Sequence, residues 1–276
     1  MIHKTGTLNS LDGLKLFTQT WLPDTEPIAL IYLIHGLGEH CGRYTHVAEF
    51  LTSHGLAVFS MDNRGHGQSG GERGHVNKFE DYMQDMDQLI QAARNEYPLL
   101  PAFLYGHSLG GILVLNYALR RRPDIRGVIA TSPGLRTALE EQKAKIALSK
   151  LIASILPKLS IPTGLAPEQI SHDPEVVKRY IEDPLVHDKG TPALAVNLLN
   201  SIEWVYQHAH EFPVPLLLMH GSEDQIAYAR GSQEFASKVR GDCTLKLWDG
   251  MAHETHNEPE KKEVLAYLWE WLKSKI

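Results

Sequence analysis

The sequence predicts an α/β fold, in which a mostly parallel central sheet is flanked by helices. Short apolar strands alternate with helical patterns along much of the chain. The strands are expected over residues 28–34, 56–61 and 125–131, and a helix over residues 78–97. Alternation of this kind is typical of parallel sheets that are covered by helices on both faces. An antiparallel hairpin is expected before them, over residues 6–22 with its turn at Asp12-Gly13.

The alternation stops between residues 135 and 211, where helix-like pieces and several prolines replace the strand pattern. We therefore expect three parts: a core over residues 1–134, a helical cap over 135–211, and the rest of the core over 212–276. Within the cap, helical spacing places five apolar residues on one stripe: Leu148, Leu151, Ile152, Ile155 and Leu156. Two interpretations stay open, because the stripe either packs against the rest of the cap or meets a lipid surface.

The motif Gly106-His107-Ser108-Leu109-Gly110 lies between an apolar run over residues 101–105 and a helical pattern over 111–119. A strand, a sharp turn and a helix form the context in which G-x-S-x-G presents a nucleophilic serine. The glycines permit the tight, strained turn that exposes the serine oxygen. A second copy around Ser69 follows no strand, so we expect it to belong to a glycine-rich loop.

A nucleophilic serine needs a base and an acid further along the chain, each on a loop after a strand. Asp224 follows the apolar run over residues 214–221, with Glu223 as the neighbouring alternative, and His253 follows the break at Asp249-Gly250. In this arrangement His253 takes the proton of Ser108 during attack, and Asp224 orients the imidazole and stabilises its charged form.

An oxyanion that forms on the substrate needs two N–H donors. We expect the backbone amide of Leu109 to be one of them. The amide of Leu37 is the other, on the glycine-containing loop that follows the strand over residues 28–34. His35, at the start of that loop, is interpreted as a hydrogen-bonding strut beneath it.

Further motifs carry a resemblance that covers nearly the whole chain. They are His35 to His40 with Arg43-Tyr44, Asp62 to Ser69, Gly106 to Gly111, Asp183 to Val186, His220 to Asp224, and Ala252-His253. On these residues the chain resembles the monoacylglycerol lipase and lysophospholipase branch of the α/β-hydrolase superfamily. The resemblance implies an α/β-hydrolase fold with a cap. It also implies hydrolysis of monoacylglycerol esters, through an acyl-enzyme, to fatty acid and glycerol.

The same resemblance implies that Glu39, Arg43, Tyr180 and His256 bind the glycerol moiety. Glu39 and Arg43 can instead pair with each other, and Tyr180 can be a surface residue of the cap. Other functions also stay open: a lysophospholipase, a short-chain carboxylesterase or thioesterase, and a ligand receptor that keeps the fold without catalysis.

Composition narrows the classes of partner. The net charge of −6 argues against nucleic acid and against an anionic membrane surface as electrostatic partners. Cys41 and Cys243 lie far apart, which favours free thiols in a reducing compartment, so we expect a cytoplasmic protein. The histidines have no metal-type spacing, and we expect no metal or cofactor. The expected partners are a small lipid ester and, through the cap, a lipid or membrane surface that is contacted transiently.

Overall fold

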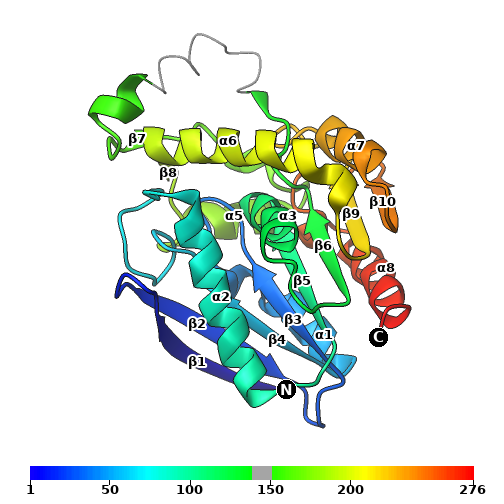
Figure 1. The fold of residues 1–276 in the computed structure, drawn as a ribbon. Coiled ribbons are helices and arrows are strands. Elements are labelled where there is room, and N and C mark those ends of the chain that lie inside the picture. Colours follow the sequence, from blue (N-terminus) through cyan, green and yellow to red (C-terminus); the bar gives the residue numbers. More distant parts are fainter. Residues whose placement is uncertain (139–150) are drawn as a thin grey trace.

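An eight-stranded sheet forms the centre of the molecule (Figure 1). This computed structural model describes residues 1–138 and 151–276. The strands are β1 Ile2–Asn9, β2 Lys15–Leu22, β3 Ala29–Ile34, β4 Leu56–Met61, β5 Ala102–His107, β6 Gly127–Thr131, β9 Leu216–Gly221 and β10 Cys243–Trp248. Their order across the sheet is β1-β2-β4-β3-β5-β6-β9-β10. The hairpin β1–β2 and the pair β2–β4 are antiparallel, and the pairs from β4 to β10 are parallel. The predicted fold class and hairpin are therefore confirmed.

Helices cover both faces of this sheet. On one face lie α2 Phe79–Glu96 and α3 Leu109–Arg121, with α6 Pro192–His208 packed across them, and on the other lie α1 Thr45–Ser53 and α8 Lys261–Lys273. The sequence of strand β3 is a continuous apolar run, because both of its faces are buried. Leu30, Tyr32 and Ile34 pack in the first hydrophobic core, and the intervening Ala29, Ile31 and Leu33 pack in the second. A strand buried on both faces has no polar side to alternate with.

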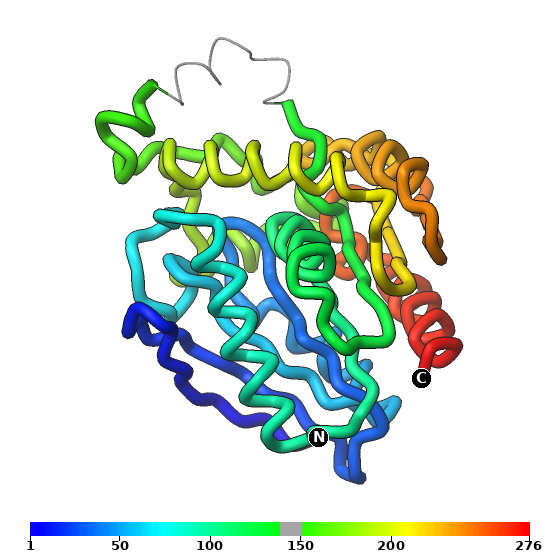
Figure 2. Tube along the Cα trace, in the orientation of Figure 1, coloured from blue at the N-terminus to red at the C-terminus, as the bar shows by residue number. Residues whose placement is uncertain are grey.

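The segment between β6 and β9 departs from this alternation. It contains a short two-stranded sheet of β7 Ile161–Pro162 and β8 Lys189–Gly190, a 3-10 turn η3 Pro167–Gln169, helix α5 Pro174–Glu182, and α6. The Cα trace in Figure 2 shows this segment above the sheet, with α6 running across the top of the molecule. Helix α6 contributes Leu194 and Val205 to the core that it shares with α2 and α3. It therefore ties the segment to helices α2 and α3, and the predicted limits of the cap stay a prediction.

The apolar stripe of the predicted cap is described only in part. Leu148 lies outside the described residues. Leu151, Ile155 and Leu156 are 59%, 69% and 55% exposed, and Ile152 is half-buried. Neighbouring parts of the described cap therefore leave most of these side chains uncovered. Among the described residues, no helix is long and apolar enough to cross a membrane.

Candidate active site

The turn between β5 and α3 holds Ser108 in a strained conformation. Its φ is 52° and its ψ is −111°, in a region that L-residues rarely adopt. Both flanking glycines are required by close approaches of the backbone. A Cβ on Gly106 would lie 2.2 Å from the Gly110 carbonyl oxygen, and one on Gly110 would lie 2.0 Å from that of Ile34. The strand, turn and helix expected around Ser108 are thus present, and they project its side chain from the start of α3.

Ser69, in the second copy of the motif, has a different environment. Its side chain is buried, its Oγ donates to the Asp62 carbonyl at 2.6 Å, and it accepts the Phe17 amide at 2.8 Å. These bonds fasten the glycine-rich loop to β2. The hydroxyl of Ser69 is therefore occupied in holding the loop.

Asp224 and His253 are joined although 29 residues separate them. Nδ1 of His253 donates to Asp224 Oδ2 at 2.7 Å, and Oδ1 of the same carboxylate accepts the amides of Ile226 and Ala227 at 2.8 and 2.9 Å. The alternative acid, Glu223, has 62% of its side chain exposed and points toward His172 instead. Of the two neighbouring carboxylates, Asp224 is the one that contacts the imidazole.

The electrostatics of this pair suit a base. Burial favours the neutral form of His253, but the negative charge of Asp224 and the hydrogen bond to it outweigh burial and raise the pKa of the imidazole. Burial likewise opposes ionisation of Asp224. The charge of His253 and the bonds from His220 and His253 outweigh it, and they hold the pKa of the carboxyl well below its usual range. Because Nδ1 carries the proton given to Asp224, Nε2 is the nitrogen that can take the proton of Ser108.

His220 is a member of this cluster that sequence reasoning missed. Its Nε2 lies 3.0 Å from Asp224 Oδ2, the same oxygen that His253 contacts. It stands on β9 four residues before Asp224, and only this spacing could have indicated the contact.

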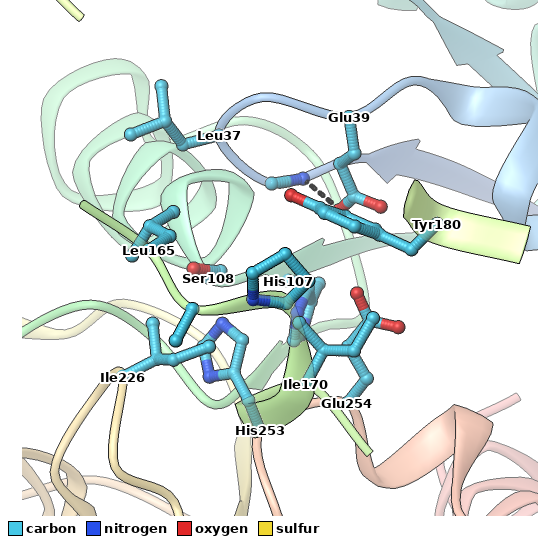
Figure 3. A pocket seen from close by; sticks show the side chains of 13 residues that line it. Leu37, Glu39, His107, Ser108, Leu165, Ile170, Tyr180, Ile226, His253 and Glu254 are labelled. Atoms are coloured by element: carbon cyan, nitrogen blue, oxygen red, sulfur yellow. Dashed lines mark hydrogen bonds between the residues drawn. The ribbon is translucent and has the colours of Figure 1, made fainter. Parts of the chain in front are cut away.

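Ser108 and His253 line one pocket (Figure 3). Side chains from the core and from the segment above the sheet surround it. They include Leu37, Glu39, His107, Leu165, Ile170, Tyr180, Ile226 and Glu254. The predicted nucleophile, base and oxyanion loop therefore share one site with the predicted cap.

The loop that carries Leu37 is held from several directions. The amide of Gly36 donates to Glu39 Oε1 at 2.6 Å, and the carbonyl of Gly38 accepts the His187 amide of the inserted segment at 2.8 Å. Leu109, the other predicted donor, is the first residue of α3, where backbone N–H groups have no partner within the helix. Both predicted oxyanion donors thus lie beside Ser108, one on the loop and one at the helix start.

His35 lies beneath this loop and is fully buried. The Asn63 amide donates to its Nε2 at 2.8 Å, so its proton is on Nδ1, which donates to the Gly36 carbonyl at 2.7 Å. Burial lowers the pKa of His35 to about 3, despite the hydrogen bond to Gly36. It is therefore a neutral imidazole that links two loops, in agreement with its interpretation as a strut.

A buried ion cluster lies next to the pocket. Arg43 donates a hydrogen bond to the carboxylate of Glu39. It also donates two hydrogen bonds to the carboxylate of Glu254, at 2.6 and 2.7 Å. Its guanidinium lies 4.7 Å from the centre of the Tyr180 ring. Burial raises the pKa of Glu39 against the opposing charge of Arg43. For Glu254 the charge and bonds of Arg43 outweigh burial and lower the pKa to about 2. The predicted pairing of Glu39 with Arg43 is present, and Glu254 is a partner that the sequence did not indicate.

The four residues predicted to bind glycerol occupy different depths. Glu39 and Tyr180 line the pocket, whereas Arg43 and His256 are not among its lining residues. His256 is 1% exposed and stacks on Tyr44 at 4.9 Å, with the pocket-lining His107 4.8 Å away on another side. Within residues 1–138 and 151–276, no group of His, Cys, Asp and Glu side chains is placed to hold a metal ion.

The sheet, the strained serine turn and the inserted segment define an α/β-hydrolase. Residues 25–260 match the serine aminopeptidase S33 family, and the chain belongs to this family. The chain is also similar to monoacylglycerol lipases. It is 34% identical to a monoacylglycerol lipase of Mycolicibacterium smegmatis, over 96% of this chain and 95% of that protein. The crystal structure of the Paleococcus ferrophilus monoacylglycerol lipase superposes with a TM-score of 0.86 at 36% identity, covering 95% of this chain and 99% of that one. An abhydrolase domain-containing protein of Dictyostelium discoideum is 38% identical over the whole chain, which spans 30% of its length.

Proposed function

We propose that this chain is a serine ester hydrolase that cleaves monoacylglycerols to fatty acid and glycerol. One observation carries the proposal: Ser108, on its strained turn, lines the same pocket as His253, whose Nδ1 is bonded to Asp224. The two monoacylglycerol lipases to which the chain is similar support the choice of substrate.

In the proposed mechanism Nε2 of His253 takes the Ser108 proton as Oγ attacks the ester carbonyl. Asp224 stabilises the imidazolium, and the amides of Leu37 and Leu109 donate to the oxyanion of the tetrahedral intermediate. Collapse of the intermediate transfers the proton from His253 to the departing glycerol oxygen and leaves an acyl-enzyme. A water molecule then repeats the attack with His253 as base, and it releases the fatty acid.

The lining of the pocket supports an amphiphilic substrate. Leu165, Ile170 and Ile226 supply apolar surface for an acyl chain, and Glu39 and Tyr180 supply polar atoms for the glycerol hydroxyls. Arg43 holds the Glu39 carboxylate in place through a hydrogen bond. A direct contact between His256 and glycerol stays a prediction, because His256 is not among the residues that line the pocket.

The predicted cap would present this pocket to lipid. The exposed side chains of Leu151, Ile155 and Leu156 support a transient contact with a membrane or another lipid surface. Cys41 and Cys243 are free thiols in the structure, which supports the proposed cytoplasmic location.

The proposal is tested by assaying wild type and Ser108→Ala on 1-monooleoylglycerol, lysophosphatidylcholine, p-nitrophenyl butyrate and an acyl thioester. We expect wild type to prefer monooleoylglycerol, the variant to lose turnover of every substrate, and an alkyl fluorophosphonate to label Ser108. Preference for the lysophospholipid, or for the short ester, would favour one of the alternative hydrolases. Saturable binding of monooleoylglycerol by wild type without turnover would indicate a receptor, and an adduct on Ser69 would refute the assignment of the nucleophile.

A further inference from the structure

A second imidazole contacts the carboxylate that orients the proposed base. His220, at the end of β9, is fully buried, and its Nε2 lies 3.0 Å from Asp224 Oδ2 and 2.7 Å from the Ala227 carbonyl oxygen. Its Nδ1 lies 2.7 Å from the hydroxyl of Ser232, which is buried on helix α7 Ala229–Lys238. His253 contacts the same Asp224 oxygen from the other side at 2.7 Å.

The partners of His220 determine its tautomer. A carboxylate and a backbone carbonyl only accept hydrogen bonds, so Nε2 must carry a proton. In a neutral imidazole Nδ1 is then an acceptor, and the Ser232 hydroxyl is the donor that it meets. Because Ser232 occupies Nδ1, it keeps the ring in the orientation and tautomer in which Nε2–H faces Asp224.

We propose that His220 and Ser232 are positioning residues that fix the Asp224 carboxylate for His253. With them Asp224 has four donors, namely the amides of Ile226 and Ala227 on Oδ1 and the two imidazoles on Oδ2. The inference rests on the proposed hydrolase function, because it assigns a role within that reaction. It extends the line of hydrogen-bonded groups from His253 through Asp224 and His220 to Ser232 on helix α7.

The hydrogen bond from His220 also affects the electrostatic attraction between Asp224 and His253. A donor on Oδ2 draws negative charge away from His253, so its removal strengthens the attraction between Asp224 and the imidazolium. We therefore expect loss of His220 to move the acid limb of the kcat/KM profile to higher pH. The titratable and charged groups that face this cluster are Asp224, His253 and His107, with Glu254, Glu39 and Arg43 acting at longer range.

The test measures p-nitrophenyl butyrate hydrolysis from pH 5 to pH 9 for His220→Ala, His220→Gln and Ser232→Ala. Loss of a hydrogen bond to a charged group predicts about a tenfold or larger fall in kcat/KM for His220→Ala. Gln places an N–H near the position of Nε2, so His220→Gln should recover most of the activity and restore the acid limb. Ser232→Ala should lower activity when His220 is present and should have little effect in the His220→Gln background, where there is no imidazole to hold.

Ser237→Ala is the matched control, because Ser237 lies on the same helix, is exposed and donates to the Glu234 carbonyl rather than to any group of the site. Thermal melting of each variant reports any loss of folding, and the two milder variants keep the test informative if His220→Ala unfolds. The inference is wrong if Ser232→Ala behaves like Ser237→Ala, if His220→Gln is no more active than His220→Ala, or if the acid limb does not move. Failure of the proposed function differs from these outcomes, since wild type would then show no Ser108-dependent hydrolysis at all.

Discussion

Arg43→Met would leave the carboxyl groups of Glu39 and Glu254 buried without the cation that they share. The side chains of the three residues are 10%, 3% and 3% exposed, so the cluster belongs to the buried class of ion pairs. Removing one partner of such a pair costs about 3–5 kcal/mol, because the remaining charge stays desolvated. For a chain of this size, that loss corresponds to a fall in Tm of roughly 10 °C.

The pH dependence of this loss follows from the pKa values. In wild type the pKa of Glu254 is about 2, below its usual 4.5, so its contribution to stability is complete above pH 4.5 and is lost as the pH falls toward 2. Between pH 8 and pH 5 the wild-type protein therefore keeps the stabilisation that Glu254 contributes. In Arg43→Met, burial without an opposing cation raises the pKa of both carboxyl groups, and they take up protons as the pH falls. The difference in Tm between wild type and variant should consequently narrow from pH 8 to pH 5.

Thermal unfolding followed by circular dichroism at both pH values measures this difference. Arg122→Met is the matched control, because Arg122 pairs with Glu211 at 3.2 Å but has 57% of its side chain exposed. Exposed pairs contribute about 0–1 kcal/mol, so this control should melt close to wild type. Equal losses for the two variants, or a difference that widens at pH 5, would refute the reasoning about Arg43.

Three other predictions concern the proposed reaction and the lipid surface. Because Asp224 raises the pKa of His253, kcat/KM should fall with a single ionisation as the pH drops through a value above 6.5. An apparent pKa of the acid limb below 6.5 would contradict the electrostatic argument. His256→Ala should slow monooleoylglycerol turnover several-fold and spare p-nitrophenyl butyrate, because one hydrogen bond to glycerol contributes about 0.5–1.5 kcal/mol. Equal losses of activity on the two substrates would mean that His256 supports the structure of the site and does not bind glycerol. Ile155→Ser with Leu156→Ser should reduce sedimentation with phosphatidylcholine vesicles, whereas Leu99→Ser, at a residue 93% exposed outside the predicted cap, should not; unchanged sedimentation would exclude a role for this surface.

The sequence predicted the sheet because local patterns determine it. The parallel strands β3, β4, β5, β6 and β9 are short, mainly apolar and fully buried, and Ser108 is recognisable because its strand and helix adjoin it in the chain. The pairing of Asp224 with His253 could be anticipated for a related reason. The carboxyl ends of parallel strands meet at one edge of the sheet, so loops after β9 and β10 must be neighbours there.

The remaining features depend on contacts that spacing along the chain does not encode. Glu254 meets Arg43 across 211 residues, and no local pattern distinguishes it from an exposed glutamate. His256 follows His253 by three residues, but the 3-10 turn η5 Thr255–Asn257 directs its ring against Tyr44 rather than into the pocket lining. The exposure of Leu156 likewise depends on what packs beside it.

The loop that carries His253 is supported by the inserted segment as well as by the core. The amide of Glu254, next to the base, donates to the Ile170 carbonyl at 2.7 Å, and the hydroxyl of Ser171 donates to the Asn257 carbonyl at 3.0 Å. Since Ile170 also lines the pocket, the same short segment contacts both the space for substrate and the backbone that positions the base. A displacement of that segment would therefore change the placement of His253 together with the shape of the pocket.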